Sequence, residues 1–175
     1  MKPLSTSLLC VFALGGAMTA AAQTKPAPAA HAHPPQSAAA APQMEVPAAA
    51  QPAVAVVKRF GKSLAAGDFK TVEALLDADV LILETGGAER SRQEYLSHHA
   101  ISDAQFLKGT HNQLKRRTAR TEGNLAWVGT ESELHASKDG KPLVLLSTET
   151  MVLKKTGADW QIVHIHWSSR PKKAK

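Results

Sequence analysis

Hydrophobic and polar positions change their spacing along the chain, and the first clear pattern is helical. From Ala53 to Leu64 apolar residues recur at intervals of three and four, with basic residues on the other side. This spacing is typical of an amphipathic helix. Gly67 is placed to end that helix. Asp68 is placed to cap a second helix, which runs to Leu76.

A short strand and a further helix are predicted next. Residues 80–83 form an uninterrupted apolar run, which is typical of a buried strand, and a Gly-Gly turn follows. Ser91 and Glu94 have the spacing of a capping box, in which two residues satisfy each other's backbone donors at a helix start. We expect this helix to bend or break near residues 102–103.

The second half of the chain alternates with a period of two, which is typical of strands. The separators combine glycine with asparagine or aspartate, as tight turns between antiparallel strands do. The predicted strands cover residues 110–121, 125–136, 143–155 and 160–168. Helices followed by such a meander indicate an α+β domain, with N-terminal helices packed on one face of a curved antiparallel sheet.

The N-terminal segment shows neither pattern. Residues 1–22 start with a basic residue, continue with a short apolar run and end in three alanines. This is the form of a cleaved signal peptide rather than of a retained anchor, so we expect a periplasmic or secreted protein. Residues 23–52 are rich in alanine and proline, which predicts a disordered linker. The domain is then expected at residues 53–170, with a basic tail at residues 171–175.

Charge and composition exclude several kinds of partner. The chain has 21 Lys and Arg against 15 Asp and Glu, a formal net charge of +6, and four of the basic residues lie within residues 170–175. The basic group at residues 115–120 has no interleaved aromatic residue, so we expect no nucleic-acid partner. We interpret it as a solvated strand, or as an arginine that reaches from a pocket toward a carboxylate. No apolar run long enough to span a membrane follows residue 22, and the single cysteine excludes a disulfide framework.

Two sequence motifs carry a resemblance to a known superfamily. The segments Ser147–Leu153 and Trp160–Ser169, the second reading WQIVHIHWSS, resemble the last strands of the nuclear transport factor 2-like superfamily. They are most similar to SnoaL-like domains and to the association domain of calcium/calmodulin-dependent protein kinase II, and Gly-Asp-Phe at residues 67–69 is similar to the helical opening of this group. The resemblance implies a cystatin-like, cone-shaped barrel with a ligand-binding pocket at its wide end. It implies no particular reaction, because the superfamily includes isomerases, dehydratases, cyclases and non-catalytic modules.

His164 and His166 are the first candidates for catalysis. Because they are two apart on a strand, both side chains should leave the same face, roughly 7 Å apart. Glu149 on the neighbouring strand is placed to orient one of them as a general base. The same three residues can instead be structural and hydrogen-bond to neighbouring strands. With His111 they could also hold zinc or copper, but no spacing signature supplies a further ligand, so we expect no metal ion and no cofactor.

Three more residues are predicted to line the pocket. Tyr95 and His99 share a helix face at a spacing of four, and Trp127 lies on a predicted strand. Their ordinary interpretation is the edge of an apolar core.

The sequence leaves three functions open. The first is an exported SnoaL-like protein whose pocket binds a small molecule of unknown specificity. The second is an enzyme of the isomerase or lyase type that uses a His/Glu acid–base pair. The third is a non-catalytic dimerisation or association module. A homodimer through the sheet is expected because Val163, Ile165 and Trp167 should stand on the face opposite the histidines.

Overall fold

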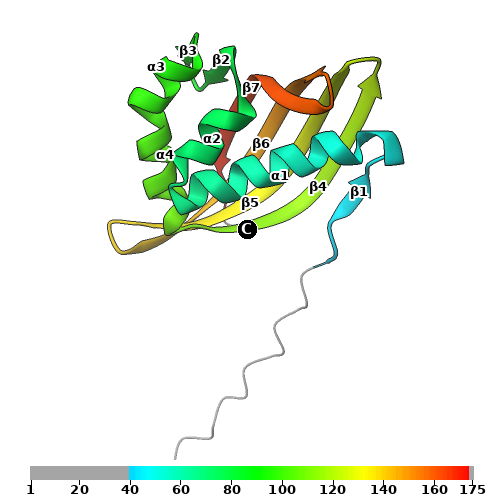
Figure 1. Cartoon of the computed structure of the whole chain (residues 1–175). Helices are drawn as coiled ribbons and strands as arrows, with labels where there is room; N and C mark the ends of the chain where they lie inside the picture. Colours follow the sequence, from blue (N-terminus) through cyan, green and yellow to red (C-terminus); the bar gives the residue numbers. More distant parts are fainter. Residues whose placement is uncertain (1–39, 174–175) are drawn as a thin grey trace, which may run out of the picture. The chain divides into compact units, whose positions relative to one another are not determined.

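The computed structural model describes residues 40–173 of the chain, which form helices on one face of a sheet (Figure 1). The expected signal peptide, residues 23–39 of the expected linker with His31 and His33, and residues 174–175 lie outside the described residues. Within the described residues, no helix is both long enough and apolar enough to cross a membrane.

The first two helices follow the predicted pattern. Helix α1 (Gln51–Ala66) runs along the concave face of the sheet (Figure 1). The apolar side chains that it buries are Ala53, Val54, Val57, Phe60 and Leu64. Gly67 ends α1 in the left-handed conformation at φ 70°, which glycine adopts without strain. The Asp68 carboxylate then accepts a hydrogen bond of 3.1 Å from the Thr71 backbone N–H and caps α2 (Phe69–Leu75).

The predicted capping box starts helix α3 (Arg92–Ser97). Ser91 Oγ accepts a hydrogen bond of 3.1 Å from the Glu94 backbone N–H, as the motif predicts. The Glu94 carboxylate accepts instead from the backbone N–H of Arg90, at 2.7 Å, one residue before the position that a standard box uses.

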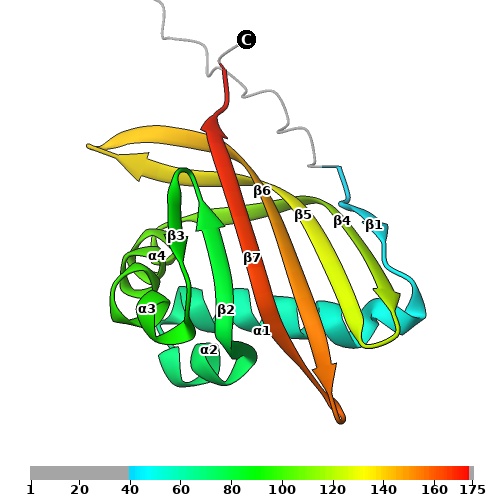
Figure 2. The same ribbon diagram turned by 90° about the horizontal axis from the view of Figure 1, so that it is seen from above.

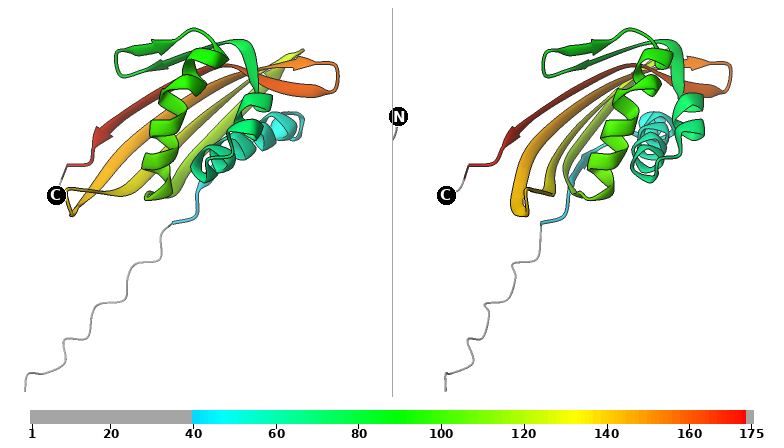
Figure 3. Two further views of the ribbon diagram at one scale, coloured as in Figure 1. Left: turned by 60° about the vertical axis from the view of Figure 1, so that its left-hand side comes forward. Right: turned by 90° about the vertical axis from the view of Figure 1, so that its left-hand side faces the viewer.

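The helix break lies earlier than the sequence suggested. Helix α4 (His99–Lys108) begins directly after His98, whose φ of −140° and ψ of −68° are not helical. The expected break near residues 102–103 is therefore wrong, and Asp103 lies inside α4. Both α1 and α4 cover the same face of the sheet (Figure 3).

The predicted four-strand meander is confirmed, and it forms the centre of the sheet (Figure 2). Its strands pair antiparallel in the order of the sequence. They are β4 (His111–Glu122), β5 (Leu125–Lys138), β6 (Lys141–Thr156) and β7 (Asp159–Pro171).

Three further strands extend the sheet at both sides. β2 (Leu76–Glu84) pairs parallel with β7 and antiparallel with β3 (Gly87–Glu89), and β1 (Gln43–Glu45) pairs parallel with β4. The order β1-β4-β5-β6-β7-β2-β3 leaves β1 and β3 as edges. The sheet is thus curved and open at both edges, with the helices packed on one face as the predicted fold class requires.

Part of the segment expected to be a disordered linker is ordered. β1 and the 3-10 turn Ala48–Ala50 both precede Ala53, at which the domain was expected to start. The pairing of β1 with β4 satisfies backbone groups at this edge, while Val46 packs against the core and Ala50 is fully buried. The ordered structure therefore includes residues that composition alone assigned to the linker.

A β-bulge in β4 decides which arginine faces the helices. Leu114 pairs with Ser132 and Arg116 pairs with Glu131, so Lys115 is an extra residue on its strand. Because side chains alternate along a strand, one extra residue reverses the faces of all that follow. Arg117 consequently faces the helices and is buried.

A second bulge lies in β7 at Val163. Ile162 pairs with Leu153 and His164 with Val152, so the bulge separates the faces of Ile162 and His164. Strict alternation along β7 would place these two side chains on one face, and the bulge prevents this.

The same bulge changes the assignment of the other apolar residues of β7. Ile165 is fully buried in the core, and Trp167 stacks on Phe60 of α1 with 6.4 Å between ring centroids. Ile165 and Trp167 do lie on the face opposite His164 and His166, but this face packs against the helices. It is therefore not the surface through which a dimer was expected.

Candidate functional site

A cavity of about 620 Å³ lies between α1, α4 and the concave face of the sheet. Its walls are largely apolar, and the side chains that form them include Phe60, Leu64, Phe106, Leu107, Leu114, Leu134 and Leu145. Its charged lining residues are Glu84, Asp103, Arg117 and Glu149, with Lys58 on α1. This size and this mixture of apolar walls with a few polar groups are typical of small-molecule sites.

Arg117 is a buried cation in this cavity. Its side chain is brought there by the bulge in β4, and the residue is 9% exposed. Arg117 Nε donates to Thr130 Oγ1 at 3.2 Å, which is the one side-chain hydrogen bond that the guanidinium makes within the described residues. Burial lowers the pKa of Arg117 and the charge of Glu149 opposes this change, so the guanidinium stays charged.

Glu149, a predicted catalytic residue, lines the same cavity from β6. Glu149 Oε2 accepts a hydrogen bond of 2.9 Å from Nε1 of Trp167, its register partner on β7. The expected contact between Glu149 and a histidine does not form, because His164 and His166 leave the opposite face of the sheet.

His164 and His166 do not belong to the lining of this cavity. His164 Nδ1 lies 2.8 Å from the carbonyl oxygen of Leu81. A carbonyl only accepts, so Nδ1 carries the proton and donates. His166 is exposed on the outer face of the sheet. The hydrogen bond of His164 matches the interpretation that this residue is structural. Within residues 40–173, neither histidine side chain hydrogen-bonds to a residue that lines the pocket, so a catalytic role for either of them stays a prediction.

Tyr95 and Asp103 form a buried polar pair beside the cavity. Tyr95 is fully buried, and its hydroxyl donates to Asp103 Oδ2 at 2.9 Å. Burial raises the pKa of Asp103, and the hydrogen bond from Tyr95 and the charge of His99 act against this change. Burial beside Asp103 also raises the pKa of Tyr95, which keeps the phenol protonated. Tyr95 thus supports a lining residue rather than lining the pocket itself.

His99 joins two carboxylates that the sequence analysis did not single out. His99 Nδ1 contacts Glu89 Oε1 and lies 3.2 Å from Glu84 Oε1. Burial and the charge of Asp103 raise the pKa of Glu84, while His99 lowers it. For the neighbouring Asp103 the sequence did contain a signal. Tyr95, His99 and Asp103 follow one another at a spacing of four, which is typical of residues on one helix face.

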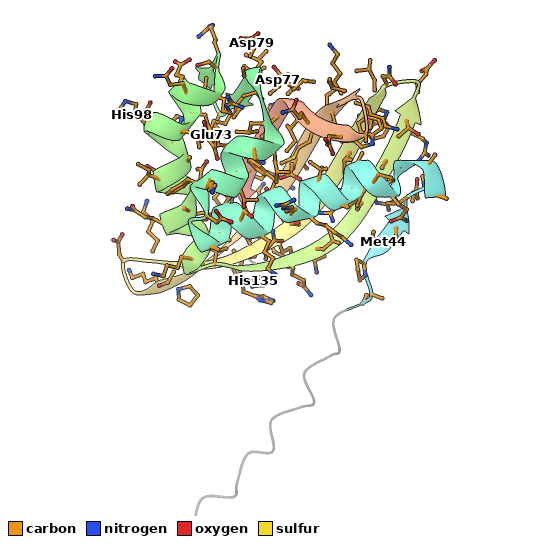
Figure 4. The ribbon with its side chains drawn as sticks, viewed as in Figure 1. Met44, Glu73, Asp77, Asp79, His98 and His135 are labelled. Atoms are coloured by element: carbon orange, nitrogen blue, oxygen red, sulfur yellow. The ribbon has the colours of Figure 1, made fainter. Side chains whose placement is uncertain are left out.

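Trp127 lies away from the cavity, contrary to the predicted pocket. It is 43% exposed, and its ring lies over Gly129 on the outer face of β5. His135 follows on the same face of β5, and Figure 4 shows it pointing away from α1. Trp127 therefore marks the surface of the sheet that the helices leave uncovered.

Comparison with known proteins identifies the family of this domain. The family model of the SnoaL-like domain matches residues 54–171. The chain belongs to the SnoaL-like domain family. A protein of Shewanella frigidimarina described as a candidate ketosteroid isomerase is similar to it at 35% identity, with a TM-score of 0.65. The match covers 71% of this SnoaL-like chain and 98% of that protein. No curated protein matches the chain.

Other solved structures are similar in fold alone. A candidate calcium/calmodulin-dependent protein kinase II association domain from Xanthomonas campestris is 22% identical, covers 76% of this SnoaL-like chain and 97% of its own, and has a TM-score of 0.59. The CaMKII hub of S. rosetta is 20% identical, covers 69% and 95%, and has a TM-score of 0.61. Similar structures described as having a cystatin-like fold confirm the predicted fold class.

Proposed function

We propose that this exported SnoaL-like domain binds a small organic molecule with a carboxylate group in the cavity beneath α1. The observation that carries the proposal is Arg117. Its guanidinium is buried in a cavity with apolar walls, yet within the described residues only its Nε donates a hydrogen bond. A buried charge is stable when it is paired and hydrogen-bonded, and the two Nη groups of a guanidinium suit a planar carboxylate.

The rest of the cavity supports the same class of ligand. Its apolar walls and its volume suit an aliphatic or aromatic body of modest size. Glu149 is held by Trp167 in the same lining, where its carboxylate is able to accept a hydrogen bond from a hydroxyl of the ligand. The ligand is thus expected to be a carboxylic acid with an apolar body, and a hydroxy acid would use both groups.

The test compares two neighbouring arginines of β4. Arg117→Met removes the positive charge from the cavity and keeps a long side chain there. Arg116→Met makes the same change on the outer face of the sheet. We expect candidate carboxylic acids to raise the melting temperature of the wild type and of Arg116→Met, but not of Arg117→Met. A ligand at about a hundred times its Kd stabilises the folded state by about 2.7 kcal/mol, which is readily measured.

Each variant is compared with its own ligand-free form, so a change in basal stability does not affect the result. The amide of the same acid serves as the uncharged control ligand. Equal ligand-induced shifts in wild type and Arg117→Met would contradict the proposal. Native mass spectrometry of the protein from its own compartment would identify an occupant directly.

A second candidate is proton-transfer chemistry of the isomerase or lyase type in this cavity. Burial raises the pKa of both Asp103 and Glu84, so each carboxyl group is suited to hold a proton and to donate it to a substrate. The similarity to a candidate ketosteroid isomerase favours this class. In this proposal Asp103 and Glu84 replace the expected His/Glu pair as acid and base. The test is Asp103→Asn, which should lose turnover but still bind the ligand.

A homodimer through the outer face of the sheet is part of the proposal. It no longer rests on Ile165 and Trp167, which face the helices. Its support is Trp127, an exposed tryptophan on the outer face, together with the similarity to association and hub domains.

A further inference from the structure

Three side chains from separate elements converge at one end of the cavity. Glu84 ends β2, Glu89 ends β3, and His99 begins α4. The hairpin register pairs Glu84 with Gly87 and places Glu89 opposite Ile82, so both carboxylates come from one small hairpin. One imidazole nitrogen and one carboxylate oxygen from each glutamate all lie within 4.8 Å of one another.

The oxygens of this cluster are not satisfied by the described residues. The Glu89 side chain is 6% exposed, and its Oε2 is buried with no hydrogen-bond partner. Glu84 Oε1 is likewise buried and without a hydrogen-bond partner. Within the described residues, His99 is the one basic side chain within 4 Å of either carboxylate. The buried carboxylate of Glu89 and the partly exposed one of Glu84 therefore share a single imidazole. This arrangement leaves buried oxygens of both groups unsatisfied unless a further positive charge joins it.

We propose that Glu84, Glu89 and His99 bind a divalent transition-metal ion, of which zinc and manganese are the representative cases. One imidazole with two carboxylates is a ligand set that such ions accept, at about 2.0–2.2 Å for zinc. Calcium is disfavoured, because it takes about six to eight oxygen ligands and no nitrogen. A cation among these atoms pairs both orphan carboxylate oxygens.

The position of the cluster indicates what such an ion would meet. Three protein ligands leave a coordination position open, as in zinc sites that bind a further molecule rather than in closed structural sites. Glu84 also lines the large cavity, so an ion held by Glu84 lies at its edge. The sequence analysis expected no metal ion, but it weighed only His164, His166, Glu149 and His111 as ligands.

The proposal is independent of the carboxylate ligand proposed above. Arg117 is not a member of the cluster, so Arg117→Met is expected to leave metal binding unchanged. Loss of one kind of binding without the other then shows which of the two proposals fails.

The experiment measures zinc and manganese binding to the chelator-treated full-length mature protein by titration calorimetry and by metal-induced thermal shift. All variants carry His31→Ala and His33→Ala, so that linker histidines do not contribute. We expect one ion per chain, and more than tenfold weaker binding in Glu89→Gln and in His99→Ala. Cobalt substitution adds a spectroscopic readout, since its visible absorption reports ligand number and geometry.

Two histidine variants serve as matched controls. His98→Ala changes the residue before His99. His98 is exposed and projects outward from the junction of α3 and α4 (Figure 4). His135→Ala disrupts the pair His111–His135 on the outer face, with 6.0 Å between ring centroids, the natural place for adventitious binding. Both controls are expected to bind metal like the parent.

Folding of the variants does not limit the test. Glu89→Gln keeps the size of the side chain and removes one of two adjacent buried charges, so the metal-free variant should melt no lower than the metal-free parent. His99 is half-exposed, so His99→Ala should also fold. Undiminished metal binding in both variants, loss of binding in His135→Ala instead, or no metal-induced shift in the parent would overturn the proposal.

Discussion

Arg117 is buried and Asp103 is partly buried in one cavity, but their surroundings favour opposite charge states. The guanidinium of Arg117 stays charged, and Glu149 lies on the same wall of the cavity, because both residues pair in register with Thr130 of β5. Asp103, in contrast, is shifted toward its protonated form by burial. The cavity therefore offers a polar ligand a guanidinium from the sheet and, from α4, a carboxyl group whose protonation burial favours.

At the scale of residues, the sequence predicted some of the residues that line the cavity, but not which residues they contact. Glu149 could be named from its place on the strand next to the histidines. An arginine reaching from the pocket was one of the two interpretations of the basic group. Their actual neighbours depend on which face each strand presents, which residue identity does not determine. Glu84 and Glu89 escaped notice because isolated glutamates on a short hairpin carry no spacing signature.

The hydrogen bond between Tyr95 and Asp103 should contribute to stability. We expect Tyr95→Phe to lower the free energy of unfolding by about 1–2 kcal/mol at pH 7, because a buried acceptor loses its donor. The loss should be smaller at pH 4 than at pH 7, because a larger fraction of Asp103 is then protonated and a protonated carboxyl group needs the donor less. Urea denaturation at both pH values measures the effect. In an Asp103→Asn background the same substitution should cost clearly less, and equal costs in both backgrounds would contradict the coupling.

At the scale of elements, the helices and the meander followed from periodicity, whereas the bulges did not. The extra residue of the bulge in β4, Lys115, is the first of three consecutive basic residues, so their polarity does not indicate which of them is extra. At Val163 the neighbouring positions are all apolar or histidine, and the alternation can be assigned either way. A bulge changes only the register, so a pattern of period two cannot reveal it where both faces of a strand have similar polarity.

His164 should have a stabilising role that His166 lacks. His164 Nδ1 donates to the Leu81 carbonyl and ties β7 to β2 next to the bulge. We expect His164→Ala to lower the free energy of unfolding by about 1 kcal/mol. His166→Ala is the matched control, an exposed residue two positions along on the same face, and should change stability by less than about 0.5 kcal/mol. Urea unfolding midpoints decide the matter, and equal effects would show that the hydrogen bond is unimportant.

At the scale of the whole molecule, the two faces of the sheet carry different kinds of side chains. The concave face carries the core and the cavity, and its buried carboxyl groups make stability depend on pH. The convex face carries exposed side chains from β4 to β7, including Trp127, His135 and His166. We therefore expect the concave face to bind the proposed ligand and the convex face to form the proposed dimer.

The raised pKa of Asp103 should make part of the stability depend on pH. Because its pKa in the folded state lies above its ordinary value of 3.8, the folded protein binds this proton more strongly than the unfolded chain. The contribution is full below the unfolded pKa and is lost as pH rises through the folded pKa. We expect the stability of the wild type relative to Asp103→Asn to decrease from pH 4 toward pH 7.

The comparison must be made against this variant, since other groups act in the opposite sense. The pKa values of Asp68 and Glu133 are lowered, by the hydrogen bond with Thr71 and by that from Lys172, so their contributions are lost as pH falls. Guanidinium denaturation at intervals of half a pH unit measures the difference. A constant difference between wild type and Asp103→Asn would show that Asp103 does not titrate as expected.

Association through the convex face is the last expectation, and Trp127 is its most direct test. An exposed tryptophan over a glycine on a sheet gives a flat apolar surface, which is favourable to bury against a second copy. We expect sedimentation equilibrium at micromolar concentration to show a dimer for the wild type and a monomer for Trp127→Glu, because the substitution places a charge in the contact. Ile101 on α4 has nearly the same exposure, 45%, but lies in the helix layer on the other face of the sheet, so Ile101→Glu should stay dimeric. A monomeric wild type, or dissociation by Ile101→Glu alone, would exclude the convex face as the interface.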